Sequence, residues 1–239
     1  MSIVSNTIVY LDGESVLEGF FAYDDAISGQ RPVVLIHHAW AGRDEFVAEK
    51  AKLLAEAGYL AFATDMYGKG VLGSSPEQNA QLMQPFIADR LKLQQRLLAA
   101  LATVKLMPWA DNHKVAAIGF CFGGLCALDL ARSGVDICGV VSFHGLLFAP
   151  ENLAKNKIKA KVLVLHGHDD PMVPVEQVLA LQAELTIAEA DWQFISYGNT
   201  VHAFTNPQAN NPDFGTIYKP LVAQRAWQAM QSFLTEIFA

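Results

Sequence analysis

The sequence predicts an α/β fold with a mostly parallel central sheet and helices on both faces. Short apolar runs rich in Val, Ile, Leu and Phe recur along the chain, as expected of strands that are buried on both faces. Segments with helical periodicity separate these runs. Strands that alternate with helices are joined by right-handed crossovers, which build a parallel sheet. Because no repeat, linker or low-complexity tract interrupts the pattern, we expect a single domain over residues 1–239.

The alternation assigns an element to most of the chain. A hairpin comes first, with strands at 7–10 and 17–22 around the turn at Asp12 and Gly13. The expected buried strands are 33–37, 59–64, 114–119, 137–143, 161–166 and 192–197. The expected helices are 44–56, 85–106, 124–132, 175–188 and 218–237. The longest connection, 68–85, fits either part of a lid or an ordinary surface segment.

Composition excludes several classes of protein. An apolar content of 52% supplies a sizeable core, and a net charge of −7 leaves no basic surface for nucleic acid. No basic leader and no run of membrane-spanning length occurs. Three cysteines are too few for a disulfide framework. We therefore expect a soluble cytoplasmic protein, monomer or homodimer, with a small-molecule substrate and no nucleic-acid or membrane partner.

The strand near residues 115–119 runs into the sequence Gly-Phe-Cys-Phe-Gly-Gly and then into an apolar helix. This is the nucleophile-elbow pattern of α/β-hydrolases, with Cys121 in the place of serine. At the N-terminus of a helix, free backbone N–H groups favour a thiolate, and the N–H of Phe122 can donate to an oxyanion. The competing interpretation is that the glycines only let strand and helix pack closely, as in a dinucleotide-binding turn.

Candidates for the acid and the base follow in the order that this architecture uses. The strand 161–166 leads into two adjacent aspartates, and Asp170 fits the position of the acid better than Asp169, which would cap the turn. The loop after the last strand carries His202. His202 would share the proton of Cys121, while Asp170 would orient the imidazole.

Ligands of parallel sheets bind beyond the carboxyl ends of the strands. The loop after strand 33–37 should supply a second oxyanion donor, for which we select the backbone N–H of Trp40. The same rule suggests several further pocket residues, namely His38, Ala39, Tyr67, His144 and Phe204.

Together, the segments 119–124, 170–174 and 201–204 resemble the dienelactone hydrolase family over nearly the whole chain. The resemblance implies an α/β-hydrolase fold, a triad of Cys121, His202 and Asp170, oxyanion donors at Phe122 and Trp40, and hydrolysis of lactones or esters without a cofactor. The chain is also similar to members that promiscuously hydrolyse phosphotriesters.

Two departures from the family pattern bear on the substrate. The founding enzymes have a glutamate where this chain has Ala39, and an arginine for the substrate carboxylate where it has Asn206. The resemblance therefore implies a neutral substrate and a different route to cysteine activation.

Three other functions fit parts of the sequence. A metal hydrolase would use the histidines near strand ends, but only His166 and His168 show short ligand spacing. A catalytically silent relative could bind a small ligand or act as a scaffold, since fold alone does not imply function. Redox sensing at Cys121 lacks a second cysteine positioned to resolve it. We expect no metal.

Overall fold

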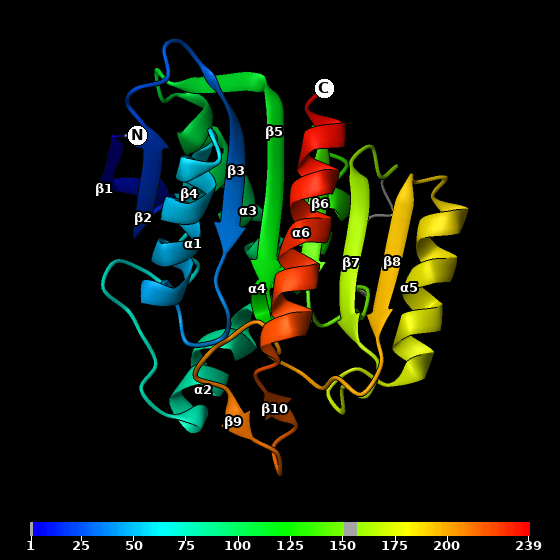
Figure 1. Ribbon diagram of the computed structural model, residues 1–239. Coiled ribbons are helices and arrows are strands. Elements are labelled where there is room, and N and C mark those ends of the chain that lie inside the picture. The colour runs from blue at the N-terminus through cyan, green and yellow to red at the C-terminus, as the bar shows by residue number, and fades with distance from the viewer. Residues whose placement is uncertain (1, 151–156) are drawn as a thin grey trace. The chain divides into compact units, whose positions relative to one another are not determined.

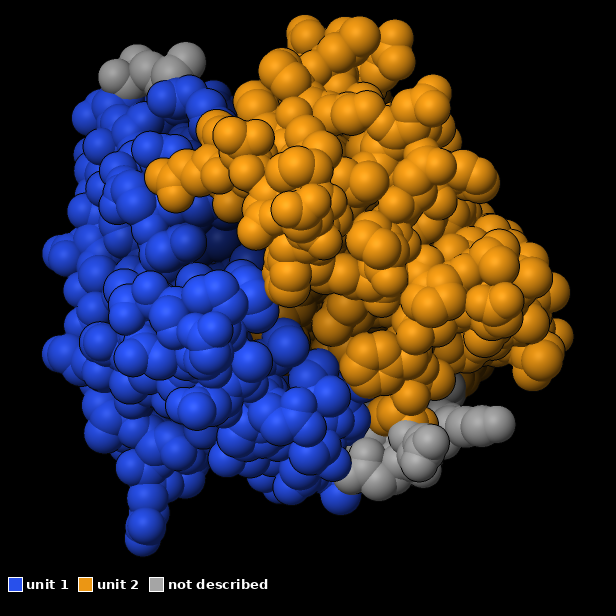
Figure 2. Space-filling model, turned by 90° about the horizontal axis from the view of Figure 1, so that it is seen from below, with its two compact units in different colours: residues 1–117 blue, residues 118–239 orange. Residues whose placement is uncertain are grey.

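The computed structural model describes residues 2–150 and 157–239. The chain forms two compact units, Met1–Ala117 and Ile118–Ala239, which Figure 2 shows in blue and orange. In the described helices, none is long and apolar enough to cross a membrane.

The first unit contains four strands in the order β1-β2-β4-β3 (Figure 1). Strands β1 (Ile3–Asp12) and β2 (Ser15–Asp24) form a long antiparallel hairpin, and β2 pairs antiparallel with β4 (Leu60–Ala63). Strand β3 (Arg31–His37) runs parallel to β4, and residues 33–36 are fully buried. Helix α1 (Glu45–Glu56) is capped by the Asp44 side chain and packs on β2 and β4.

The second unit contains three parallel strands in the order β6-β7-β8. They are β6 (Gly139–Phe143), β7 (Lys161–Gly167) and β8 (Trp192–Tyr197). Helices α4 (Phe122–Arg132) and α6 (Pro220–Ile237) pack against β6. Helix α5 (Val175–Ile187) lies between β7 and β8 in the chain, so it is their crossover connection. Strand β5 (Ala110–Phe120) begins in the first unit and ends in the second. The predicted mostly parallel α/β fold is confirmed.

One predicted helix is wrong in its bounds. The expected helix 85–106 is two helices, α2 (Pro76–Ala88) and α3 (Arg90–Lys105), so most of the connection predicted at 68–85 is helical. Ser75 caps α2 and Pro76 occupies its first position, where a missing N–H costs nothing. Asp89 has extended backbone angles, and its side chain accepts hydrogen bonds from the N–H groups of Leu91 and Lys92. Asp89 therefore ends one helix and caps the next.

A small hairpin between β8 and α6 was not expected. Its two-residue strands are β9 (Asn210–Asn211) and β10 (Thr216–Ile217), and they pair antiparallel. An isolated bridge joins His202 to Thr216. The hairpin therefore lies directly beside the loop that carries the candidate base.

Candidate active site

The turn between β5 and α4 holds Cys121 in a strained conformation. Its backbone angles are φ 55° and ψ −117°, in the region that glycine normally occupies. A Cβ at Gly119 would lie 1.9 Å from the carbonyl oxygen of Gly123, so only glycine allows the strand and the helix to pass this closely. Such backbone strain costs about 1–3 kcal/mol and is concentrated at functional sites. The pattern recognised in the sequence therefore corresponds to a real sharp turn.

Cys121 is half-buried at the first turn of α4. Its N–H donates to the Phe143 carbonyl at 3.0 Å, and its own carbonyl accepts from the N–H of Gly124 at 2.9 Å. The N–H groups of the first helical turn have no intrahelical acceptor and carry a partial positive charge. The start of α4 therefore places partial positive charge at Cys121.

His202 and Asp170 form a buried pair. Nδ1 of His202 lies 2.7 Å from Oδ2 of Asp170, and the two residues are 2% and 4% exposed. The other carboxylate oxygen of Asp170 accepts from the N–H of Met172. A carboxylate that contacts Nδ1 fixes the proton on that nitrogen, so Nε2 is the atom available for proton transfer. Asp169 instead accepts from the N–H of Thr200 at 3.0 Å and supports the turn.

The charge of His202 depends on Cys121. Burial alone lowers the pKa of His202, but the negative charge of Cys121 and the hydrogen bond to Asp170 outweigh it and raise the pKa to about 10. Nε2 is buried and, apart from its interaction with Cys121, has no hydrogen-bond partner in residues 2–150 and 157–239. The surroundings of His202 thus favour its protonated, imidazolium form.

Two further histidines surround this pair and remain neutral. The ring of His144 lies 5.1 Å from that of His202, and its Nε2 is 2.7 Å from Oγ1 of Thr205. Burial, together with the nearby charge of His202, holds the pKa of His144 well below its usual value. Burial also lowers the pKa of His166. Positive charge at this end of the second unit is therefore concentrated on His202.

Within the part of the chain that the structure describes, the site histidines do not belong to any set of three or more possible metal ligands. Among the described residues, no group of three or more His, Cys, Asp or Glu side chains is placed to hold a metal ion.

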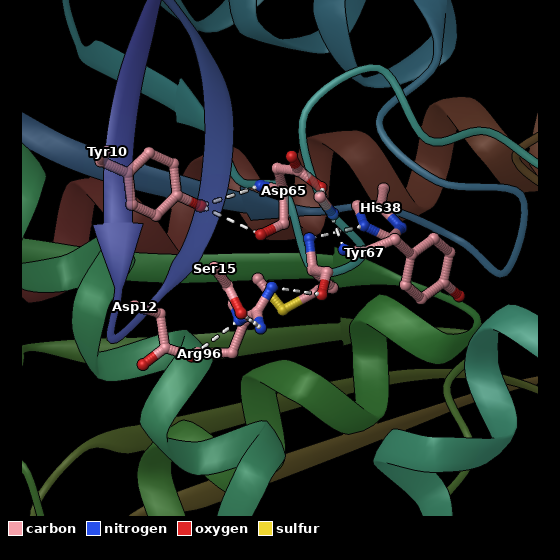
Figure 3. Close-up of polar contacts among 9 residues, drawn as sticks. Tyr10, Asp12, Ser15, His38, Asp65, Tyr67 and Arg96 are labelled. Atoms are coloured by element: carbon pink, nitrogen blue, oxygen red, sulfur yellow. Dashed lines mark hydrogen bonds and ion pairs between the residues drawn. The ribbon is translucent and has the colours of Figure 1, made fainter.

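The pocket candidates of the first unit are held by hydrogen bonds (Figure 3). Nδ1 of His38 donates to the Ala39 carbonyl at 2.6 Å, and its Nε2 accepts from the N–H of Met66 at 3.2 Å. Burial lowers the pKa of His38 to about 4, so this ring is a neutral structural link. The Tyr67 hydroxyl donates to the Trp40 carbonyl at 2.9 Å. The loops after β3 and β4, which carry Trp40 and Tyr67, are therefore joined.

Asp65 holds the second of these loops in place. Its carboxylate accepts from the N–H groups of Tyr67 and Gly68 and, through the other oxygen, from that of Glu18. The Tyr10 hydroxyl donates to the Asp65 carbonyl and accepts from the Asp65 N–H. Every one of these polar groups has a partner, which rigidifies the loop.

Arg96 of α3 joins this network from a distant part of the chain. Its guanidinium contacts the Asp12 carboxylate at 2.8 Å, the Ser15 hydroxyl at 3.0 Å and the Met66 carbonyl at 3.0 Å. The sequence did not single out this arginine, because 84 residues separate it from Asp12. We call the contacts of Tyr10, Asp65 and Arg96 the Asp65 network.

Phe204 packs in the interior of the second unit. It is fully buried, with its ring 5.0 Å from that of His144 and 5.7 Å from that of Tyr197. Phe204 therefore supports His144 from the core, whereas Ala39, Trp40 and Tyr67 are partly exposed.

Comparison with known proteins identifies the chain. Residues 17–238 match the model of the dienelactone hydrolase family. The chain belongs to the dienelactone hydrolase family. Its match spans nearly the whole sequence, so the resemblance seen in the motifs is confirmed, and as a family member the chain is a hydrolase of ester bonds.

Individual relatives agree with this assignment. A putative carboxymethylenebutenolidase of Yersinia pestis is 28% identical over 234 residues, which cover 92% of this chain and 84% of that protein. The crystal structure of a dienelactone hydrolase-like promiscuous phosphotriesterase, P91, from metagenomic libraries has 35% identity and a TM-score of 0.93, with 100% of each chain covered. A structure called m3DLH has 37% identity and a TM-score of 0.94, again with 100% of each chain covered.

Proposed function

We propose that this protein hydrolyses small neutral esters or lactones without a metal ion, using the Cys121 thiolate as nucleophile. The proposal rests on three features that occur together in one unit. Cys121 is strained at the start of α4, the interaction with Cys121 raises the pKa of the buried His202, and His202 lies 2.7 Å from Asp170. Each feature alone has a structural explanation, but a triad needs all three.

The proposed reaction has two stages. The thiolate of Cys121 attacks the carbonyl carbon, and the bond to the leaving-group oxygen breaks as the His202 imidazolium gives that oxygen its proton. Neutral His202 then takes a proton from water, and the resulting hydroxide attacks the thioester. The C–S bond breaks, so the acid is released and the thiolate–imidazolium pair is restored.

The negative charge that develops on the carbonyl oxygen needs donors. We assign this role to the backbone N–H groups of Phe122 and Trp40. Phe122 is the first residue of α4, at the end of the helix that carries partial positive charge. Trp40 lies in the loop that Tyr67 ties through its hydroxyl. Losing one such donor costs about 100- to 1,000-fold in kcat in comparable sites.

The substrate is proposed to be uncharged. Ala39 supplies no carboxylate, and Asn206 accepts a hydrogen bond from the N–H of Gln208, a role within its own turn. Similarity to P91 supports phosphotriesters as a promiscuous second substrate class, with the thiolate attacking phosphorus.

The test is a panel of p-nitrophenyl esters, neutral lactones and paraoxon, run in EDTA on the wild type and on Cys121→Ala. We expect ester or lactone turnover that persists in EDTA and falls by about 10⁴-fold or more in the variant. Turnover that survives in Cys121→Ala would refute the nucleophile. If no substrate reacts and iodoacetamide modifies Cys121 at the rate of an ordinary thiol, the protein is a silent scaffold instead.

A further inference from the structure

The β9–β10 hairpin contacts the loops of both His202 and Asp170. Gly215, just before β10, has φ +76°, and its N–H donates to the Pro212 carbonyl at 3.0 Å. This bond closes the turn of the hairpin. The hairpin thus presents one glycine at a fixed position between the two loops.

On the side of the base, the hairpin holds the backbone of His202. The His202 N–H donates to the Gly215 carbonyl at 3.0 Å, and the His202 carbonyl accepts from the N–H of Ile217 at 3.2 Å. Both backbone polar groups of His202 are therefore satisfied by residues of one short hairpin. A shift of the hairpin would move His202 with it.

On the side of the acid, Gly215 packs against the residue that follows Asp170. A Cβ placed at Gly215 would lie 2.2 Å from Cγ and 2.9 Å from Cδ of Pro171, but 3.6 Å from its Cβ. The first two distances are far below van der Waals contact, whereas the third is ordinary. The far side of the proline ring is thus seated directly on the bare Cα of Gly215.

We propose that Gly215 is a positioning residue that sets the separation between the Asp170 carboxylate and the His202 imidazole. Its carbonyl fixes the base, and its missing side chain lets Pro171 bring the acid within 2.7 Å. The inference rests on the proposed function, because it assigns the two loops a catalytic role. A methyl group at residue 215 must displace either Pro171 or the hairpin, and either movement lengthens the contact.

The experiment compares kcat and KM for a neutral p-nitrophenyl ester in four variants. Gly215→Ala is expected to lower kcat by about 100-fold with KM changed less than about threefold, since a displacement of about 1 Å in a catalytic geometry has that effect. Gly29→Ala is the matched control, because Gly29 has φ +82° and a Cβ there would meet no atom within 4 Å. It carries the same backbone strain and should keep the activity of the wild type.

The remaining variants separate the clash from the strain. Pro171→Ala removes Cγ and Cδ, so a Cβ at residue 215 then meets only the retained Cβ at 3.6 Å. The double variant Pro171→Ala, Gly215→Ala should recover at least about tenfold in kcat over Gly215→Ala, with Pro171→Ala alone measured as its reference. A double variant no more active than Gly215→Ala, or a Gly215→Ala protein with the kcat of the wild type, would overturn the proposal.

A readout without turnover separates this inference from the proposed function. Nuclear magnetic resonance titration of His202 should give a pKa near 10 in the wild type and a lower pKa in Gly215→Ala, because a longer contact with Asp170 stabilises the imidazolium less. The double variant should restore the pKa of the wild type. If the protein turns over no ester but shows this pattern, the function fails while the positioning role stands. Equal titrations in all variants would contradict the positioning role even in an active enzyme.

Discussion

The Asp65 network of the first unit and the histidine cluster of the second, which consists of His144, His166 and His202, differ in how their buried polar atoms are hydrogen-bonded. Tyr10 bonds the backbone of Asp65, the Asp65 carboxylate accepts from neighbouring N–H groups, and Arg96 bonds Asp12, Ser15 and the Met66 carbonyl. By contrast, Nδ1 of both His144 and His166 is buried with no hydrogen-bond partner among the described residues, and Nε2 of His202 has only its interaction with Cys121. Unsatisfied buried groups cost about 1–3 kcal/mol each, so a fold retains them where they serve another purpose. The difference suggests that the first network supports loops while the second cluster carries out proton transfer.

The largest effect is expected when one carboxylate of the second unit is neutralised. Asp170→Asn should lower kcat by about 10³- to 10⁴-fold, because an amide no longer stabilises the imidazolium or its tautomer. Asp169→Asn is the matched control: its side-chain oxygen can still accept from the Thr200 N–H, so kcat should fall by less than about tenfold. Steady-state kinetics on both variants decides the assignment, and the reverse order of effects would make Asp169 the acid.

Breaking the Asp65 network should affect stability and leave proton transfer alone. Arg96→Met removes one buried and two partly buried contacts and leaves Asp12 without its cation, which should cost about 2–3 kcal/mol in the free energy of unfolding. Urea unfolding measures the loss, with the exposed neighbour Gln95→Met as control. The alkaline limb of the pH–rate profile should stay unchanged, and a shifted limb would show that the network reaches His202.

The leaving group tests the role of the His202 proton. Since the pKa of His202 is about 10, the proton is lost above that pH and no acid remains for the leaving oxygen. Hydrolysis of an alkyl ester should therefore fall about tenfold per pH unit above pH 10, whereas a p-nitrophenyl ester, whose leaving group needs no proton, should fall much less. Parallel declines for the two esters would contradict an acid role for His202.

The smallest expected effect is a change in the pH dependence of stability, caused by the buried histidine His37. Burial lowers the pKa of His37 to about 3, so the folded state keeps this ring neutral while the unfolded chain protonates it below its ordinary value. Stability is therefore lost as the pH falls from about 6.5. His37→Asn should remove about 1.4 kcal/mol per pH unit of that loss between about pH 6 and 4. Denaturant midpoints of the wild type and of His37→Asn across this pH range give the two slopes, and equal slopes would contradict a neutral buried His37.

Local pattern predicted much of the site. The Gly-x-Cys-x-Gly turn is visible in sequence because the close approach at Gly119 excludes every other residue. Asp170 was preferred to Asp169 from its place in the loop, and the contact with His202 agrees with that preference.

Local sequence patterns do not predict contacts between residues that lie far apart in the chain. Neither Arg96 nor Gly215 has a local signal, because their partners lie elsewhere in the chain. Proline favours the first turn of a helix, so the sequence predicts a helix that begins at Pro85. In the structure Pro85 lies inside α2, which begins at Pro76, and the break between the two helices comes at Asp89.

We propose that His202 is charged because Cys121 is a thiolate. Nitrogen chemical shifts of His202, measured by nuclear magnetic resonance at about pH 8 in the wild type and in Cys121→Ala, test it directly. We predict an imidazolium in the wild type and a neutral ring, protonated only on Nδ1, in the variant, because burial, the largest influence on the pKa of His202, is then opposed by Asp170 alone. The same protonation state of His202 in both proteins would contradict the thiolate–imidazolium pair.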